Sequence, residues 1–179
     1  MQTTLKTQYT NDLHWLAFLL TGRRDQSIDL AVETVAEFHT AQPFFTAWME
    51  AWSRRVVIAK ALTGIREELA ASVRRTEFRR FHGRTFPPRH WRMNQGTTKF
   101  ELEAALLAID YFPRAALVLS VFERVPAPDC AVILDATPAL VKKALTIGLM
   151  ELTGILAGAQ GRISKSTHPW GLPTETQYA

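Results

Sequence analysis

Apolar residues recur at helical spacing through most of this 179-residue chain, and this period limits the possible folds more than any other feature. Leu13, Leu16, Ala17 and Leu20 stand at i, i+3, i+4 and i+7, the spacing of one helix face. No alternation of apolar and polar residues lasts long enough to predict a β-sheet. The pattern therefore predicts an all-α protein, whose first helix ends at Thr21-Gly22.

The remaining helices follow from the same spacing. A second apolar face consists of Ile28, Ala31, Val32, Val35 and Phe38. A third consists of Phe45, Trp48, Met49, Trp52, Val56 and Ala59, on a helix expected to continue to Leu69. Further helices are predicted over 102–109, after Pro113, over 128–134 and from Pro138 onward. Because Trp48 and Trp52 share the third face, the pattern favours core packing for both, with stacking on nucleic-acid bases as the alternative.

The net charge of +4 is unevenly distributed along the chain. Residues 72–99 hold eight Lys or Arg residues against Glu77 alone, a net of +7, whereas the flanking parts sum to −1 and −2. Gly83, Pro87-Pro88 and Gly96 argue against a packed domain there, so this segment is interpreted as a basic linker. Its arginines suit contact with nucleic-acid phosphates or, equally, a solvated linker.

Several function classes find no support in the composition. One cysteine, Cys130, excludes a disulfide scaffold and fits a reducing cytoplasm. The N-terminal residues lack the apolar core of a signal peptide, and no apolar run is long enough to span a bilayer. Hydrolase, phosphate-loop and zinc motifs are missing, and the five histidines are scattered. We therefore expect a cytoplasmic protein that is not an enzyme and has no cofactor, no metal and no membrane contact.

The segment PDCAVILDATPALVKKAL has the pattern of a helix-turn-helix. Ala131 is small where two helices must approach closely, and Val141 is apolar where the second helix packs back. Cys130, Ile133 and Leu134 are expected on the buried face of the first helix, and Asp135-Ala136 form the turn. Thr137 suits the N-cap of that helix, and Pro138 suits its first position. Lys142 and Lys143 then lie near the start of a recognition helix. The alternative is a helical hairpin that only packs.

Taken together, these segments resemble a bacterial RNA polymerase sigma factor of the extracytoplasmic-function group. LAFLLTGRRDQSIDLAVETV and FFTAWMEAW resemble region two, which melts the promoter. LEAALLAIDYFPRAALVLSVFERVPAPDCAVILDATPALVKKAL is similar to region four, which carries the helix-turn-helix. The resemblance implies a region-two-like domain over 8–71, the basic linker over 72–99, a region-four-like domain over 100–159 and a flexible tail over 160–179.

The resemblance also implies partners and site residues. Core RNA polymerase, promoter DNA and an anti-sigma factor would be the partners. The helix that would dock on polymerase carries Asp29, Leu30, Glu33 and Thr34. The residues that would contact DNA are Lys142, Lys143, Thr146, His39, Gln42, Arg54, Arg55 and Lys60. Solvated charge is the competing interpretation for Arg54, Arg55, Lys60 and the acidic helix face.

Two departures from the family pattern leave a second function open. Arg55 and Ala59 stand near positions where the family usually places Asn and Asp. The expected recognition helix offers few polar groups beyond Lys142, Lys143 and Thr146, whereas base readout needs several donors and acceptors. The primary expectation is a sigma factor that directs promoter recognition and transcription initiation. The alternative is a sigma-like protein that binds polymerase or an anti-sigma partner without reading a promoter.

Overall fold

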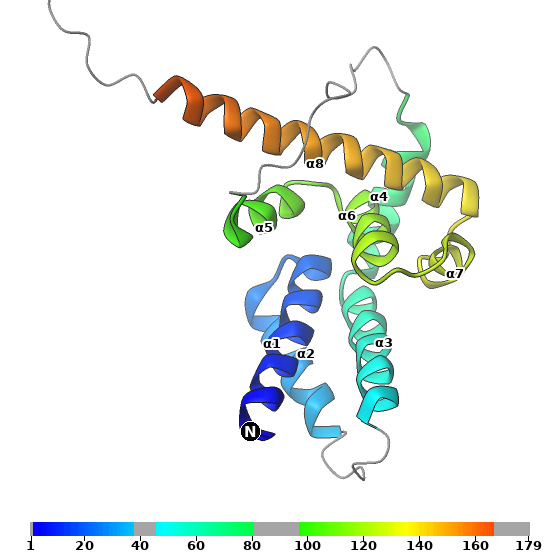
Figure 1. Cartoon of the computed structure of the whole chain (residues 1–179). Coiled ribbons are helices and arrows are strands. Elements are labelled where there is room, and N and C mark those ends of the chain that lie inside the picture. Colours follow the sequence, from blue (N-terminus) through cyan, green and yellow to red (C-terminus); the bar gives the residue numbers. More distant parts are fainter. Residues whose placement is uncertain (1, 38–45, 81–96, 167–179) are drawn as a thin grey trace, which may run out of the picture.

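The fold is helical, as the sequence predicts. A computed structural model describes residues 2–37, 46–80 and 97–166, and every regular element in these ranges is a helix. The elements are α1 (Gln2–Thr21), α2 (Arg24–Glu37), α3 (Thr46–Gly64), α4 (Arg66–Phe78), α5 (Lys99–Leu107), α6 (Tyr111–Leu117), the π-helical turn η2 (Val118–Phe122), α7 (Ala127–Ile133) and α8 (Pro138–Ser166). Figure 1 shows α1, α2 and α3 side by side beneath α8, which runs across them.

Local signals end α1 where the sequence predicts and start α5 three residues before the predicted helix. Gly22 has a φ of 72° after α1, and its N–H donates to the carbonyl of Phe18 over 2.8 Å. Thr98 and Glu101 form a reciprocal capping box at the start of α5. These signals act within one turn of the chain, so they need no tertiary partner.

The buried faces of α2 and α3 differ from the predicted ones. Ile28 and Val32 are 43% and 56% exposed, and Trp48 and Trp52 are 58% and 44% exposed. The core-facing residues include Ser27, Ala31 and Thr34 on α2, and Ser53, Val57, Ile58, Ala61 and Leu62 on α3. Each serine hydroxyl donates to a carbonyl of its own helix over 2.7 Å, which removes the main cost of burying it. The prediction that both tryptophans pack in the core is therefore wrong.

The predicted third helix is broken where it should continue. α3 ends at Gly64 and α4 begins at Arg66, with fully buried Ile65 between them. The break directs α4 toward α6, where the Ser72 hydroxyl accepts from the backbone N–H of Phe112 over 2.8 Å. The first part of the predicted linker is thus packed helix; residues 81–96 lie outside the described residues.

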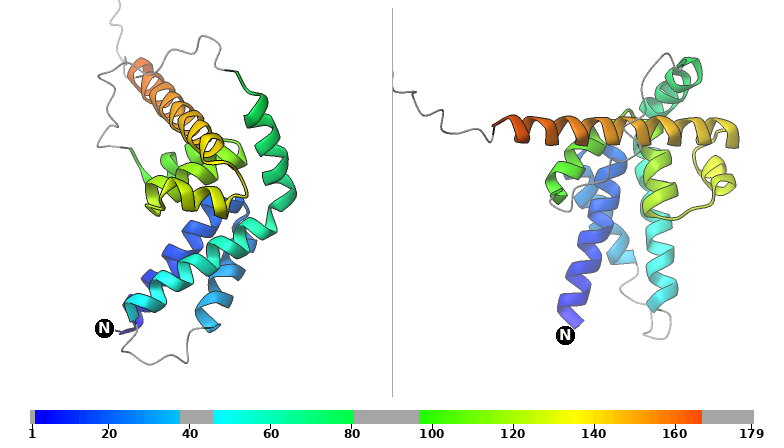
Figure 2. Two further views of the ribbon diagram at one scale, coloured as in Figure 1. Left: turned by 90° about the vertical axis from the view of Figure 1, so that its right-hand side faces the viewer. Right: turned by 45° about the horizontal axis from the view of Figure 1, so that its top comes forward.

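One hydrophobic cluster contains residues of both halves of the chain, α1–α4 and α5–α8. It includes Leu13 and Leu20 of α1, Ile65, Phe112 of α6 and Val141 of α8. α1 and α4 contact α6, and α4 also contacts α8 (Figure 2). The structure therefore does not confirm two separate helical domains.

Arg114 of α6 ties the two halves together. Its side chain is buried, and its guanidinium donates to the carbonyls of Leu20, Leu107 and Ile109 over 3.1 to 3.3 Å. Those carbonyls lie at or just beyond the C-terminal ends of α1 and α5, where helices leave acceptors without partners. A single cation thus satisfies two helix ends at once.

The last helix is longer than predicted. α8 continues to Ser166, so residues 160–166 of the predicted tail are helical, and residues 167–179 lie outside the described part. Its buried residues include Val141, Ala144 and Leu156, on the face that the spacing predicts. Among the described residues, no helix is both long and apolar enough to cross a membrane.

Candidate nucleic-acid interface

Two helices joined by a short turn occupy the segment for which the sequence predicts a helix-turn-helix. α7 and α8 are joined by a short turn in which Asp135 adopts a φ of 48°. The N–H of Ala136 donates back to the carbonyl of Ala131 over 2.9 Å, and Thr137 Oγ1 accepts from the N–H of Leu140 over 3.2 Å. Aspartate tolerates this left-handed conformation better than most residues, which explains how the turn forms without glycine.

Packing inside the motif follows the prediction with one exception. Cys130, Ala131, Leu134 and Val141 are all buried between the two helices. Ile133, which the sequence assigns to the same face, is 40% exposed and lines a cleft beside the motif. The short turn after α7 determines which residues of α7 can contact α8.

The recognition helix presents fewer polar groups to solvent than predicted. Lys143 Nζ donates to the carbonyl of Glu77 on α4 over 2.8 Å. The Thr146 hydroxyl donates to the carbonyl of Lys142 over 3.0 Å. The Lys142 ammonium is exposed and has no partner among the described residues. Of the three predicted contacts on this helix, only Lys142 is therefore uncommitted.

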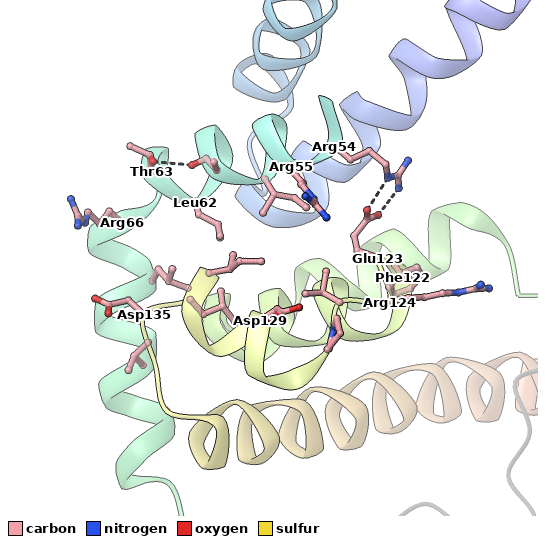
Figure 3. A pocket seen from close by; sticks show the side chains of 18 of the residues that line it. Arg54, Arg55, Leu62, Thr63, Arg66, Phe122, Glu123, Arg124, Asp129 and Asp135 are labelled. Atoms are coloured by element: carbon pink, nitrogen blue, oxygen red, sulfur yellow. Dashed lines mark hydrogen bonds and ion pairs between the residues drawn. The ribbon is translucent and has the colours of Figure 1, made fainter. Parts of the chain in front are cut away.

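Two of the three predicted cations of α3 are paired within the protein. Arg54 donates through two nitrogens to the Glu123 carboxylate, with 2.8 Å between Nε and Oε2 (Figure 3). These hydrogen bonds raise the pKa of Arg54. Lys60 Nζ lies 2.7 Å from Glu37 and 3.0 Å from Glu33, and its hydrogen bonds to these carboxylates raise the pKa of Lys60. Phosphate binding by Arg54 or Lys60 would have to compete with these acids.

A different surface on α3 is open. The rings of Trp48 and Trp52 stack on each other with centroids 5.6 Å apart and planes 13° from parallel. Arg55 follows one turn later, is exposed, and forms no ion pair with a described residue. We call Trp48, Trp52 and Arg55 the α3 surface. Exposed aromatic rings beside a guanidinium suit stacking on bases with a neighbouring phosphate contact.

The α2 residues predicted to dock on polymerase are only partly available. Asp29 and Glu33 are exposed, and Leu30 is half-buried. Thr34 is fully buried, so its side chain cannot meet a partner and this prediction is wrong. The exposed apolar residues Ile28 and Val32 accompany Asp29 instead. Their spacing signalled an apolar face, but nothing in the sequence showed that this face is left uncovered.

Other predicted residues cannot be placed. His39 and Gln42 lie outside the described residues, as do the linker arginines Arg84, Arg89 and Arg92. Within the described part of the basic segment, Arg75 binds Asp110 and Arg79 binds Glu151, with closest distances of 2.7 and 2.6 Å. Arg74 and Arg80 are exposed and form no ion pair with a described residue.

A cleft of about 1270 Å³ separates α3 and α4 from α7. Figure 3 shows Arg55 on its α3 side, Asp129 on its α7 side and the Arg54–Glu123 pair at one end. Leu62 and Leu134 contribute to its apolar lining. This cleft could not be predicted from the sequence, because its walls come from segments about 50 residues or more apart.

The described residues hold no group of three or more His, Cys, Asp or Glu side chains that could bind a metal ion. A comparison with protein-family models finds no match, and a comparison with curated proteins finds no significant match. Functional inference for this chain therefore depends on its own residues and on the resemblance of its segments.

Proposed function

We propose that this protein is a sigma-type initiation factor, which binds core RNA polymerase in the cytoplasm and brings it to promoter DNA. The observation that carries the proposal is the α7–turn–α8 motif, with its left-handed Asp135, its Thr137 cap and an exposed Lys142. In such a motif the start of the second helix enters the major groove. The polymerase, not this chain, would perform the chemistry.

The α3 surface supports a second part of the same function. Opening a duplex costs base stacking, and exposed aromatic rings return part of that free energy by stacking on the separated bases. Trp48 and Trp52 already lie close to parallel, and the exposed Arg55 follows three residues later on the same helix. This surface suits a single strand better than an intact duplex, whose bases are not accessible.

Contact with polymerase is assigned to the outer face of α2. Ile28 and Val32 are exposed there beside Asp29, so the face combines apolar area with negative charge. Protein interfaces commonly have an apolar centre and a polar rim. Replacing Ile28 and Val32 by serine is expected to weaken binding to core polymerase without unfolding the protein, because both side chains are already largely exposed.

Reconstituted transcription tests the proposal. The purified chain would be added to bacterial core polymerase on fragmented genomic DNA, and the transcript starts would be mapped. We expect starts that share an upstream motif, that disappear with Lys142→Ala and that persist with Arg66→Ala, an exposed arginine on α4. Absence of both polymerase binding and transcript starts would contradict the proposal.

A template with a pre-opened bubble tests whether the α3 surface acts in strand separation. Trp48→Ala/Trp52→Ala is expected to reduce transcription from the closed duplex and to be rescued on the opened template. Trp48→Phe/Trp52→Phe, which keeps two aromatic rings, is the matched control. Equal losses on both templates would show that the tryptophans do not act in strand separation.

One observation favours a second function. Lys143 and Thr146 are hydrogen-bonded within the protein, so the recognition helix has little left with which to read bases. The chain would then bind polymerase, or an anti-sigma partner, without selecting a promoter. Stable polymerase binding without motif-directed starts is the result expected from this alternative.

A further inference from the structure

The recognition helix is short of positive charge for a DNA-binding element. Affinity for duplex DNA comes largely from Lys and Arg contacts to phosphates, which hold the protein in register while other groups read the bases. At the start of α8, Lys142 is the one cation without a partner among the described residues. Any stable complex with duplex DNA therefore needs cations from elsewhere in the fold.

The end of α4 lies against the first half of α8. Lys143 Nζ donates to the carbonyl of Glu77 over 2.8 Å, and Arg79 lies 2.6 Å from Glu151, two turns further along α8. In Figure 1, α4 passes behind α8, and residues of the two helices are in contact. Two contacts of this kind, about 12 Å apart along α8, fix the direction of α4 as well as its position.

Two arginines without an ion pair to a described residue lie in the last turns of α4 and just beyond its end. Arg75 and Arg79 are bound to carboxylates, whereas Arg74 and Arg80 on either side of them are exposed and have no ion pair with a described residue. Arg74 lines the same cleft as Asp135, the residue in the turn of the helix-turn-helix. A guanidinium is thus brought beside the motif from the other half of the chain.

We propose that duplex DNA meets a composite surface, in which Lys142 of α8, Arg74 of α4 and Arg80, two residues after the end of α4, contact phosphates. Lys143 is a positioning residue that holds α4 in place. The inference rests on the proposed function and adds to it a helix outside the motif. Arginine suits this role because its planar group can donate two parallel hydrogen bonds to one phosphate.

Salt-dependent binding to duplex DNA tests the composite surface. The full chain would be titrated against a fluorescent duplex of about 30 base pairs at several salt concentrations. Arg74→Ala and Arg80→Ala should each lower affinity by on the order of tenfold near 0.1 M salt and reduce the salt slope by about 1. The loss should be equal for all DNA sequences, because phosphates carry no sequence information.

Arg66→Ala is the matched control: Arg66 is also exposed and lines the same cleft, but it lies at the start of α4, away from the α8 contacts of Glu77 and Arg79. It should leave both affinity and slope unchanged. If Arg74→Ala and Arg80→Ala behave like Arg66→Ala while the parent binds duplex DNA, the composite surface is overturned and the proposed function stands. If the parent itself binds no duplex DNA, promoter binding and the composite surface both fail.

A separate measurement is needed for Lys143, because replacing it by alanine removes a positive charge as well as the hydrogen bond to the Glu77 carbonyl. If Lys143 acts by positioning α4, the effect of Lys143→Ala on the salt slope depends on Arg74 and Arg80. The substitution should change the slope in the parent protein and change it much less in a variant that already carries Arg74→Ala and Arg80→Ala. Lys143→Arg, which keeps a donor for the Glu77 carbonyl, should restore most of the affinity. Fully additive slope losses would show that Lys143 contacts a phosphate itself and would overturn the positioning role.

Discussion

At the scale of single residues, buried polar groups hold this helical protein in one arrangement. Arg114 is 3% exposed and donates to three carbonyls from two helix ends. Its guanidinium also lies over the Tyr111 ring at 4.7 Å. Burial disfavours the charged form and lowers the pKa of Arg114, so the hydrogen bonds must offset a cost of desolvation. Such a residue specifies the arrangement more strongly than an apolar residue of similar size would.

Replacing Arg114 by methionine tests this role. The change keeps most of the buried volume but leaves the carbonyls of Leu20, Leu107 and Ile109 without their donor. We expect the free energy of unfolding to fall by about 3 kcal/mol, measured by urea denaturation. Arg23→Met, at a surface arginine, should cost no more than about 0.5 kcal/mol. Equal effects of the two substitutions would contradict the assigned role.

Asp110 makes the stability depend on pH. Burial raises the pKa of Asp110, but hydrogen bonds from Arg75, Ser72 and the N–H of Tyr111 outweigh it and leave this pKa below its ordinary value. A carboxyl group whose pKa is lower in the folded than in the unfolded protein stabilises the fold at pH values above its unfolded pKa. That stability is lost as the pH falls through its folded pKa. Urea midpoints measured from about pH 6 down to about pH 2 should therefore fall more steeply for the parent than for Asp110→Asn. Parallel curves for the two proteins would show that Asp110 does not contribute to the pH dependence of stability.

At the scale of elements, Gly148 allows α8 to lie close to α6 because it has no side chain. A Cβ atom added at Gly148 would lie 2.8 Å from the carbonyl oxygen of Pro113, too close for an undisturbed structure. We expect Gly148→Ala to cost about 1–3 kcal/mol, because α6 and α8 must separate. Gly154→Ala is the matched control on the same helix: nothing lies within 4 Å, and alanine should stabilise the helix by up to about 1 kcal/mol. Thermal unfolding of the two variants should therefore shift in opposite directions.

At the scale of the whole molecule, the two halves share one core. Beyond the cluster itself, Arg54 binds Glu123 and the Ser72 hydroxyl accepts from Phe112, each across the two halves. A shared core predicts one cooperative unfolding transition, with no state in which only one half is folded. Two independent domains would instead unfold separately.

Two spectroscopic probes can distinguish these outcomes. Tryptophan fluorescence reports chiefly on the first half, where Trp15, Trp48 and Trp52 lie, whereas far-UV circular dichroism reports on all helices. We expect both urea transitions to have the same midpoint. As a control, Arg54→Gln/Glu123→Gln removes one contact between the halves and should lower both midpoints together. Midpoints that differ in the parent protein would show that the halves are separate domains.

Much of the local structure could be predicted from the sequence. The end of α1 at Gly22, the cap at Thr137 and the turn at Asp135 all lie where the residue types place them. The candidate site was less accessible to prediction. Lys142 is exposed as expected, but the ion pair of Arg54 and the hydrogen bond of Lys143 involve residues 69 and 66 positions away in the sequence.

The sequence by itself determined that the chain is helical, where α1 ends and where the turn between α7 and α8 forms, because each depends on groups within about one turn of the chain. Only the tertiary structure decided which faces are buried. Trp48 and Trp52 remain exposed while Ser53 is buried, since burial follows from the shape of the neighbouring helices and not from hydrophobicity alone. The tertiary structure likewise joined both halves in one core and placed α4 beside α8. Distant segments meet only after folding, so no local pattern records those contacts.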